Sequence, residues 1–588
     1  MGSARSETRV FSGIGASPGI AIGTARVTDR SRVIVVEAAV PPEDIPAEVA
    51  RFTTALSRSR DDLLALKESL AARRGAEHLY VVDAHLLILD DSMLRQGTID
   101  LIERDGINAE AALKKNLDKF KEFFAGIDDD YLRERFGDVE TVVERILRHM
   151  VGKRHERIDA IDEGKRLIVA HDLSPTDILQ MDKGKVVGFV TDLGGRTSHT
   201  SILARAFEIP AVVGLETITA EDIDGLPVII DGTTGTIVVN PSEEMFRDYL
   251  RKKQHYDYLE QELLKLKDLP AETQDGHRMR LMGNIEFPEE IPSLTSHGGQ
   301  GVGLYRTEML YMNRPELPDE EEQYRAYAAI VENVAPDPVA IRTLDIGGDK
   351  LATDLHLEDE MNPAMGLRAI RLSLRRPEVF KSQLRAILRA GRKGTVRLFF
   401  PMISGIEEVR SAKAILRECM EELRSADIPF DEEIETGIMI EVPSAVTIAD
   451  LLAREVDFFS VGTNDLTRYS RAPGRSNQRL GLLSQPLPPA ILRSLKPVVD
   501  AAHAAGIRVC MCGEMAGEPL YLPILLGLGF DELSMTAVSI PRVKKILRRA
   551  RRADAERLVA RALTFATAAE VESFVKSEIS ARFSEGFD

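Results

Sequence analysis

Tryptophan is absent from this chain of 588 residues, and cysteine occurs only three times, at Cys419, Cys510 and Cys512. So few cysteines exclude a disulfide framework and are typical of a reducing compartment, so we expect a cytoplasmic protein. Cys510 and Cys512 match neither a zinc pair nor a redox CxxC motif. We expect them on opposite sides of a strand, so that at most one faces a site.

Long apolar runs and basic segments are also missing. No apolar stretch approaches the roughly 18 residues of a membrane helix, and no charged-then-apolar leader opens the chain, so we expect neither membrane insertion nor secretion. The net charge of −18 disfavours nucleic-acid binding, which needs clustered Lys and Arg, and suits a basic protein partner. A nucleotide fingerprint is missing too, since the chain has no GxxxxGK[ST] loop.

The order of β-prone and helix-prone segments predicts a multidomain α/β protein. Residues 9–27 are glycine-rich and β-prone, residues 43–150 show helical apolar spacing, and short β runs return over 166–240. A helical bundle inserted into a small α/β domain explains this order. We therefore expect a small α/β domain at 1–30 and 155–241, an inserted bundle at 31–154, a linker helix at 242–268 and a C-terminal domain at 269–588.

The C-terminal region repeats compact β runs with helical stretches between them. Eight such runs begin near residues 280, 301, 338, 396, 436, 458, 508 and 530. Eight strand–helix units are what a (β/α)8 TIM barrel requires, and the count favours this fold over a doubly wound sheet. Because the active site of such a barrel lies at the carboxyl ends of its strands, the residues that follow each run are candidate site residues.

Several runs end in residues suited to an anionic substrate and a metal. Glu441 and Asp465 are hard oxygen ligands on neighbouring strands, suited to Mg²⁺. Asn464 adds a neutral donor, and Cys512 is a candidate acid. Guanidinium groups that can surround a phosphate are supplied by Arg306, Arg342 and Arg475. Each residue alone has an ordinary structural explanation, but their joint occurrence at several strand ends favours phosphoryl transfer.

A second candidate site is the segment "GGRTSHTSILAR" at 194–205. His199 titrates near neutrality and is a candidate nucleophile, although a structural histidine remains the alternative. A helix predicted directly after it would favour an added phosphate through its N-terminal amides. Gly194 and Gly195 are expected to let the backbone approach that phosphate closely, and Arg196 to form an ion pair with it. Hydrogen bonds to it are expected from the hydroxyls of Thr197, Ser198 and Thr200. His85, in the predicted bundle, is either an interface residue or an ordinary surface histidine.

Seven motifs, in this order, resemble one known family. They read "GGRTSHTSILARAFEIPAVVG", "GLYRTEMLYM", "RTLDIGGDK", "NPAMGLRAIR", "IMIEVPSA", "VGTNDLTRY" and "MCGEMAG". Together they are similar to the phosphoenolpyruvate-using phosphotransferases, in the form of enzyme I of the bacterial sugar phosphotransferase system. The resemblance covers nearly the whole chain and implies a swivelling phosphohistidine domain with an inserted helical bundle, followed by a (β/α)8 barrel.

The resemblance also implies a role for each candidate residue. His199 would be phosphorylated on Nε2 by phosphoenolpyruvate, Cys512 would protonate the enolate to give pyruvate, and Glu441 and Asp465 would bind Mg²⁺. Phosphoenolpyruvate contacts would be made by Arg306, Arg342, Arg368, Asn464, Asp465 and Arg475. The helical insertion would dock the phosphocarrier protein HPr, and the barrel would form a homodimer. The family often has Thr where this chain has Ile178, which leaves open what orients the His199 ring.

Three alternatives are weighed against this interpretation. A pyruvate-phosphate dikinase or phosphoenolpyruvate synthase relative needs a nucleotide domain ahead of the histidine, where only the helical insertion and short β segments stand. A nitrogen-branch paralogue, phosphorylating an HPr-like carrier, has a sensory domain ahead of the match, which begins here near residue 10. A non-catalytic regulator is disfavoured by the intact set of strand-end residues.

Overall fold

The computed structural model of the protein describes residues 7–28, 35–74, 80–125, 130–152, 164–174, 177–178, 181–182, 184–195, 199–311, 317–346, 365–471 and 488–583. The chain falls into two compact units, Met1–Glu260 and Gln261–Asp588, which are described separately. In the part of the chain that is described, no helix combines the length and the apolar character needed to cross a membrane.

The first unit contains an eight-stranded sheet with the order β1-β8-β7-β3-β4-β5-β6-β2. β3 to β6 pair in parallel, and the strands outside them are antiparallel. The strands are β1 (Arg9–Ser12), β2 (Ile14–Ser17), β3 (Ile20–Val27), β4 (Arg166–Ala170), β5 (Val186–Thr191), β6 (Ala211–Val213), β7 (Pro227–Asp231) and β8 (Thr236–Val239). β1 and β2 are separated by one residue, Gly13, so a single stretch of chain forms both edges of the sheet.

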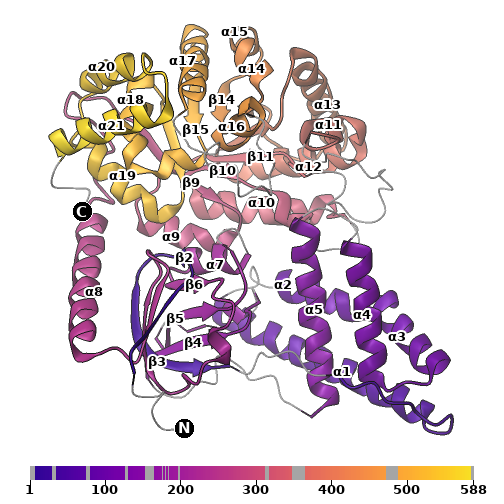
Figure 1. The fold of residues 1–588 in the computed structure, drawn as a ribbon. Coiled ribbons are helices and arrows are strands. Elements are labelled where there is room, and N and C mark those ends of the chain that lie inside the picture. Colours follow the sequence, from indigo (N-terminus) through magenta and orange to yellow (C-terminus); the bar gives the residue numbers. More distant parts are fainter. Residues whose placement is uncertain are drawn as a thin grey trace. The chain divides into compact units, whose positions relative to one another are not determined.

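The long connection between β3 and β4 is helical, as the apolar spacing predicts, and its helices form a group of their own (Figure 1). Asp91 starts α3 by accepting the Met93 N–H at 2.7 Å, and Gly106 ends it with φ +58°, a left-handed conformation that glycine adopts without strain. The helices are α1 (Ile45–Arg74), α2 (Tyr80–Asp90), α3 (Ser92–Asp105), α4 (Ala109–Ala125) and α5 (Asp130–Met150). Two more helices of the chain lie at α7 (His199–Ala206) and α8 (Glu243–Leu264).

The second unit is a closed barrel of eight parallel strands, in the order β10-β11-β12-β13-β14-β15-β16-β9. Each of the eight predicted β runs contains one of these strands to within one residue, so the predicted fold class is confirmed. They are β9 (Arg280–Ile285), β10 (Val302–Tyr305), β11 (Val339–Arg342), β12 (Val396–Phe400), β13 (Glu435–Ile440), β14 (Phe458–Val461), β15 (Arg508–Met511) and β16 (Glu532–Met535).

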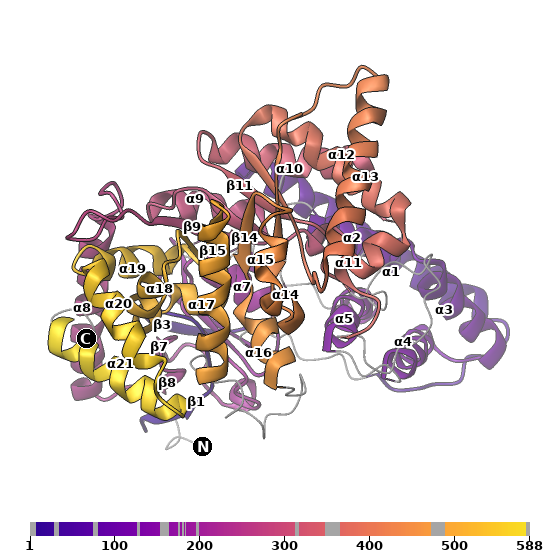
Figure 2. The same cartoon turned by 90° about the horizontal axis from the view of Figure 1, so that it is seen from above.

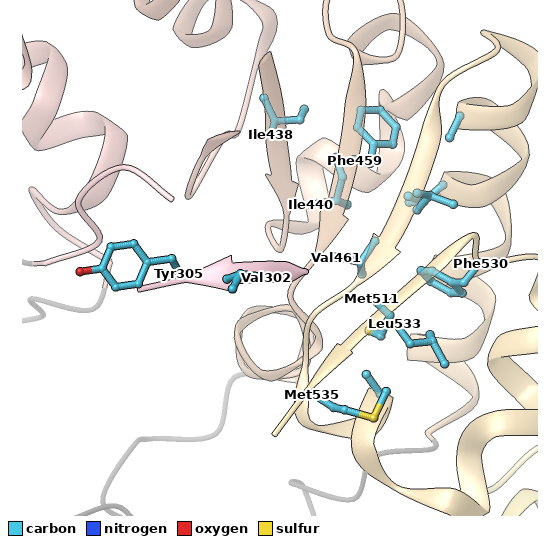
Figure 3. Close-up of a cluster of buried hydrophobic side chains, with 14 of the residues drawn as sticks. Val302, Tyr305, Ile438, Ile440, Phe459, Val461, Met511, Phe530, Leu533 and Met535 are labelled. Carbon is cyan, nitrogen blue, oxygen red and sulfur yellow. The ribbon is translucent and has the colours of Figure 1, made fainter. Parts of the chain in front are cut away.

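Helices surround the barrel strands on the outside, as the view from above shows (Figure 2). They are α9 (Ile291–Ser296), α10 (Glu320–Val334), α11 (Ala369–Arg375), α12 (Pro377–Ala390), α13 (Ile406–Ser425), α14 (Pro443–Thr447), α15 (Ala449–Leu452), α16 (Thr463–Arg471), α17 (Pro489–Ala504), α18 (Leu522–Leu528), α19 (Ile540–Leu547), α20 (Arg552–Ala562) and α21 (Ala568–Phe583). Apolar side chains on the outer face of the strands, such as Val461 and Met511, form the main core of the unit (Figure 3). Burying strands on both faces accounts for their nearly continuous apolar sequences.

The inside of the barrel is filled in levels. Near the amino ends of the strands, Arg397 on β12 donates to both carboxylate oxygens of Glu532 on β16, at 3.0 and 2.8 Å. Above this ion pair lies an apolar level that includes Phe399 and Phe458. Gly437 is required there, because a Cβ at this position would lie 2.6 Å from the Phe458 ring. The barrel is therefore solid beneath its carboxyl end, where the candidate residues lie.

The expectation for Cys510 and Cys512 is wrong in its geometry. Residues two apart on a strand face the same side, and both of these side chains are buried inside the barrel. Burial raises the pKa of Cys510 well above its ordinary value, and the Glu532 carboxylate adds to the shift. Cys510 therefore lies at the ionic level near the amino ends of the strands, and only Cys512 reaches the opposite end of the barrel.

The ion pair inside the barrel gives a stability prediction. We expect Arg397→Met to lower the free energy of unfolding of the barrel by about 3 kcal/mol, because it leaves the buried Glu532 carboxylate without this partner. Arg424→Met is the matched control, since it removes an exposed pair with Glu432 and should cost about 0.5 kcal/mol or less. Calorimetric melting of both variants measures the difference. Equal shifts of the melting temperature would contradict the structural role given to Arg397.

Candidate active site

His199 is the first residue of α7, so the predicted helix begins at the histidine itself. The first N–H groups of a helix have no partner within it and favour an anion. Two hydrogen bonds fix this helix start. Thr200 Oγ1 donates to the Leu173 carbonyl at 2.7 Å, and Ser201 Oγ donates to the Gly195 carbonyl at 2.7 Å.

Thr200 has a structural hydrogen bond that its prediction did not include. Its hydroxyl donates to a backbone carbonyl, where it orders the helix start, and its contact with phosphate stays a prediction. Ile178, which stands where relatives often have Thr, is fully buried as an apolar residue. Arg196, Thr197 and Ser198, which were expected to contact the phosphate, lie outside the described residues.

The two glycines ahead of the histidine serve different purposes. Gly194 has φ +110°, which few other residues adopt, and a Cβ there would lie 3.3 Å from the Val213 side chain. At Gly195 a Cβ would meet no described atom within 4 Å. Gly194 is therefore needed for the turn, whereas Gly195 leaves open space beside the start of α7.

His85 was expected to be either an interface residue or an ordinary surface histidine, and its position on the surface is wrong. His85 is fully buried in α2. It lies three residues after Val82 and four before Leu89, which both belong to the apolar core of the bundle. This helical spacing places His85 on the inward face of α2.

In the barrel, two buried arginines share one carboxylate. Arg342, the last residue of β11, donates to Glu308 Oε1 at 2.8 Å and lies 3.0 Å from Asp345 Oδ2. Arg368, the residue that precedes α11, donates to Asp345 Oδ1 at 2.6 Å and to the Tyr469 hydroxyl at 3.4 Å. Burial opposes the positive charge, but the surrounding carboxylates raise the pKa of both guanidiniums, so both stay charged. A fixed pair of cations results.

Arg306 follows β10 directly and forms an ion pair with Glu286, which follows the neighbouring strand β9. Burial opposes its charge, and the Glu286 carboxylate raises the pKa of Arg306 above its usual value. Arg342 is close enough to act against that rise. Three of the four predicted arginines are therefore gathered at the carboxyl end of the barrel, and Arg475 lies outside the described residues.

Glu441 and Asp465, the predicted metal ligands, follow adjacent strands. Glu441 is 1% exposed and accepts the Met402 N–H at 2.7 Å. Burial raises the pKa of Glu441 to about 8, and the Asp345 and Asp465 carboxylates add to the rise. Asp465 lies in the first turn of α16 and pairs with Arg468. A divalent cation would relieve the repulsion between these carboxylates.

The backbone near these ligands is strained at two positions. Met402 has φ +57° and Ala369, next to Arg368, has φ +53°. A left-handed conformation costs a non-glycine residue about 1 kcal/mol or more, and such residues cluster at functional sites. The turn at Met402 directs its N–H to the Glu441 carboxylate, and the turn at Ala369 follows directly on the arginine that binds Asp345.

Cys512 lies one residue beyond the end of β15 and is buried. Its sulfur accepts the Ser460 hydroxyl at 3.1 Å, and the thiol donates to the Val461 carbonyl at 3.4 Å. Burial raises the pKa of the Cys512 thiol above its ordinary value, while the Ser460 hydrogen bond and the positive charge of Arg342 oppose the rise. The thiol therefore carries its proton at neutral pH. Asn464 is exposed at the start of α16 and donates to Glu514 Oε1 at 3.3 Å.

Sequence reasoning missed the carboxylates that hold the arginines. Asp345 stands three residues after Arg342, in the motif "RTLDIGGDK". Glu308 stands two residues after Arg306, in the motif "GLYRTEMLYM". Glu286 directly follows a predicted β run, as Glu441 does at another strand. The usable signal is position at a strand end, but which carboxylate meets which arginine depends on the barrel register.

Comparison with known proteins defines the class of enzyme. Residues 260–552 match the family model for the PEP-binding domain of PEP-utilising enzymes. Residues 12–135 match the model for the N-terminal region of such enzymes, and residues 162–235 match their mobile domain. The three matches together place the chain in the class of phosphoenolpyruvate-utilising enzymes.

Full-length relatives narrow the class to one family. The chain is 43% identical over 564 residues to the phosphoenolpyruvate-protein phosphotransferase of Staphylococcus carnosus and equally to that of Bacillus subtilis, covering 96% of this chain and 98% of each relative. A solution structure of an enzyme I protein aligns with 42% of this chain and 99% of its own, at 35% identity and a TM-score of 0.37. The chain belongs to the phosphoenolpyruvate-protein phosphotransferases, and enzymes of this kind need a divalent metal.

The shared carboxylate gives a prediction for substrate affinity. We expect Asp345→Asn to raise the KM for phosphoenolpyruvate at least about tenfold, because it removes the charge that holds Arg342 and Arg368 together. The exposed Asp450→Asn is the control and should leave KM unchanged. Steady-state kinetics of both variants test this. An unchanged KM in Asp345→Asn would show that the arginines keep their places without the shared carboxylate.

Proposed function

We propose that this protein takes the phosphoryl group of phosphoenolpyruvate onto His199 and passes it to a histidine of the phosphocarrier protein HPr, releasing pyruvate. The observation that carries this proposal is the group of side chains at the carboxyl end of the barrel. Three charged guanidiniums, two candidate metal ligands and a protonated thiol occur together there. Phosphoryl transfer depends mainly on such positioning and positive charge.

In the first half-reaction, Arg306, Arg342 and Arg368 bind the phosphate and carboxylate groups of the substrate. The buried Nε of Arg342 has no hydrogen-bond partner among the described residues, which supports a ligand on this side of the guanidinium. The neutral His199 imidazole attacks phosphorus, a nitrogen–phosphorus bond forms, and the bond from phosphorus to the enol oxygen breaks. The electrons of that bond remain on the enolate.

The proposed metal is Mg²⁺. Among the described residues, no group of three or more His, Cys, Asp and Glu side chains is arranged to hold a metal alone. Glu441 and Asp465 would hold Mg²⁺, which proteins commonly bind through one or two carboxylates. When bound, the metal would neutralise charge on the substrate. Met402 keeps the Glu441 carboxylate in place through its N–H.

Cys512 completes the half-reaction by protonating the enolate. The thiol donates its proton to the methylene carbon, pyruvate forms, and the thiolate is reprotonated from solvent. Its raised pKa suits this role, because the protonated form dominates at neutral pH. Arg306 and Arg342 are near enough to favour the transient thiolate.

In the second half-reaction, phosphorylated His199 gives its phosphoryl group to the carrier. The short helix α7, tied to its surroundings through Thr200 and Ser201, presents His199 at its first turn. We propose that HPr docks on the helical insertion, without a direct contact to the buried His85, and that the barrel forms a homodimer. A nitrogen-branch carrier similar to HPr is the alternative acceptor.

The phosphohistidine is the most direct prediction. Incubation of the protein with Mg²⁺ and labelled phosphoenolpyruvate, without nucleotide, should give acid-labile label at a stoichiometry of about one per chain. His199→Ala should abolish the label. His255→Ala, which changes an exposed histidine on α8, should leave it unchanged. No label on the unaltered protein would contradict the proposed function, and label on His199→Ala would contradict the assignment of the nucleophile.

A second prediction concerns the acid. Cys512→Ala should lower the turnover rate about 100-fold or more, as is typical for loss of a general acid. Cys419→Ala, which changes a buried cysteine of α13, should have little effect. The pH dependence of the activity provides a second measurement. Because the pKa of Cys512 is raised, activity that depends on its proton should persist through neutral pH and fall only in the alkaline range. An alkaline fall that is identical in Cys512→Ala would rule this thiol out as its cause.

A further inference from the structure

The ion pair between Arg306 and Glu286 differs from the other arginine pairs in its exposure. The Arg306 side chain is 39% exposed, whereas those of Arg342 and Arg368 are 10% and 6% exposed. The carboxylates of all these pairs are largely enclosed, at 16% exposed for Glu286, 13% for Glu308 and 4% for Asp345, so the difference lies in the arginine. A substrate that enters from solvent can therefore reach Arg306 without disturbing the buried pairs.

Rigid backbone supports both members of this pair. The Arg306 N–H donates to the Ile285 carbonyl at 3.0 Å, which fixes it to the end of β9. Glu290 Oε1 accepts the N–H groups of Glu286 and Phe287, at 2.7 and 3.0 Å. The two side chains thus extend from neighbouring, anchored strand ends. Their contact depends on side-chain torsions and not on a flexible loop.

Glu286 also offsets the repulsion between Arg306 and Arg342. Arg342 lies close enough to lower the pKa of Arg306, so the two guanidiniums repel each other, while Glu286 raises that pKa. A bound phosphate would supply the same negative charge. It would also use the same guanidinium N–H groups, which a carboxylate and a phosphate recognise in the same way.

We propose that Glu286 is an internal competitor for Arg306, occupying the guanidinium when the site is empty and yielding it to the phosphate group of the substrate. This inference rests on the proposed role of Arg306 in binding phosphoenolpyruvate. Glu286 is thus a positioning residue, which keeps Arg306 ordered between turnovers and lowers the affinity for substrate. It acts on binding of the ground state and of the transition state alike, because the phosphate is anionic in both.

The test is the kinetics of Glu286→Gln in the full-length protein. KM for phosphoenolpyruvate should fall about fivefold with kcat nearly unchanged, as expected when a competing, partly exposed ion pair is lost. Binding of inorganic phosphate, measured by calorimetry, should tighten by a similar factor. Glu286→Asp keeps the charge on a shorter side chain, so its KM and its phosphate affinity should lie between those of the unaltered protein and Glu286→Gln. The matched control is Glu272→Gln, which removes a half-buried carboxylate paired with the exposed Arg278 at 2.9 Å and should change neither constant.

A double-mutant cycle with Arg306→Met separates this inference from the proposed site. If Glu286 acts through Arg306, Glu286→Gln should have no further effect on KM in the Arg306→Met background. A KM in Glu286→Gln that is unchanged or raised overturns the competitor role, even if Arg306→Met greatly weakens binding. If Arg306→Met leaves KM unchanged, the proposed phosphate site itself is wrong.

Discussion

The site depends on one constraint, which is that three like-charged guanidiniums must be held together at the end of a parallel barrel. Asp345 meets this constraint for two of them by binding Arg342 through one carboxylate oxygen and Arg368 through the other. Without anions between them, these groups would repel each other and turn to solvent. The carboxylates thus define where the positive charge lies before any substrate arrives, which is the preorganisation that phosphoryl transfer requires.

The interior of the barrel, toward the amino ends of its strands, supports this arrangement. The ion pair of Arg397 with Glu532 and the apolar level around Phe399 and Phe458 fill the barrel, so the strand ends cannot shift independently. The proposed nucleophile, His199, is held in a different manner. His199 begins a helix of eight residues whose first turn is fixed by two hydroxyl–carbonyl hydrogen bonds. The rigid pocket and the small helix belong to different compact units, in keeping with the proposal that His199 serves two reaction partners.

Periodic features of the sequence were sufficient to predict the architecture. All eight barrel strands fall inside predicted runs to within one residue, and the helix predicted directly after His199 begins at His199 itself. Errors arose where side-chain direction was decisive. Cys510 and Cys512 share a side of β15 because the strand period is two, and His85 lies inward because three- and four-residue spacing aligns it with Val82 and Leu89. Partners of the arginines could not be predicted, since Glu286 meets Arg306 only through the register of β9 with β10.

The exposure of the arginines distinguishes ion pairs that are costly to break from one that can open. Breaking the buried pairs would leave carboxylates without compensation, at a cost of several kcal/mol, so we expect Arg342 and Arg368 to keep Asp345 throughout the proposed reaction. The Arg306–Glu286 pair is partly solvated and costs far less to open. A site that must bind a phosphorylated substrate, lose the phosphoryl group and then wait empty needs one cation whose partner can change. Arg306 meets that need, since it lies beside Arg342 yet remains open to solvent.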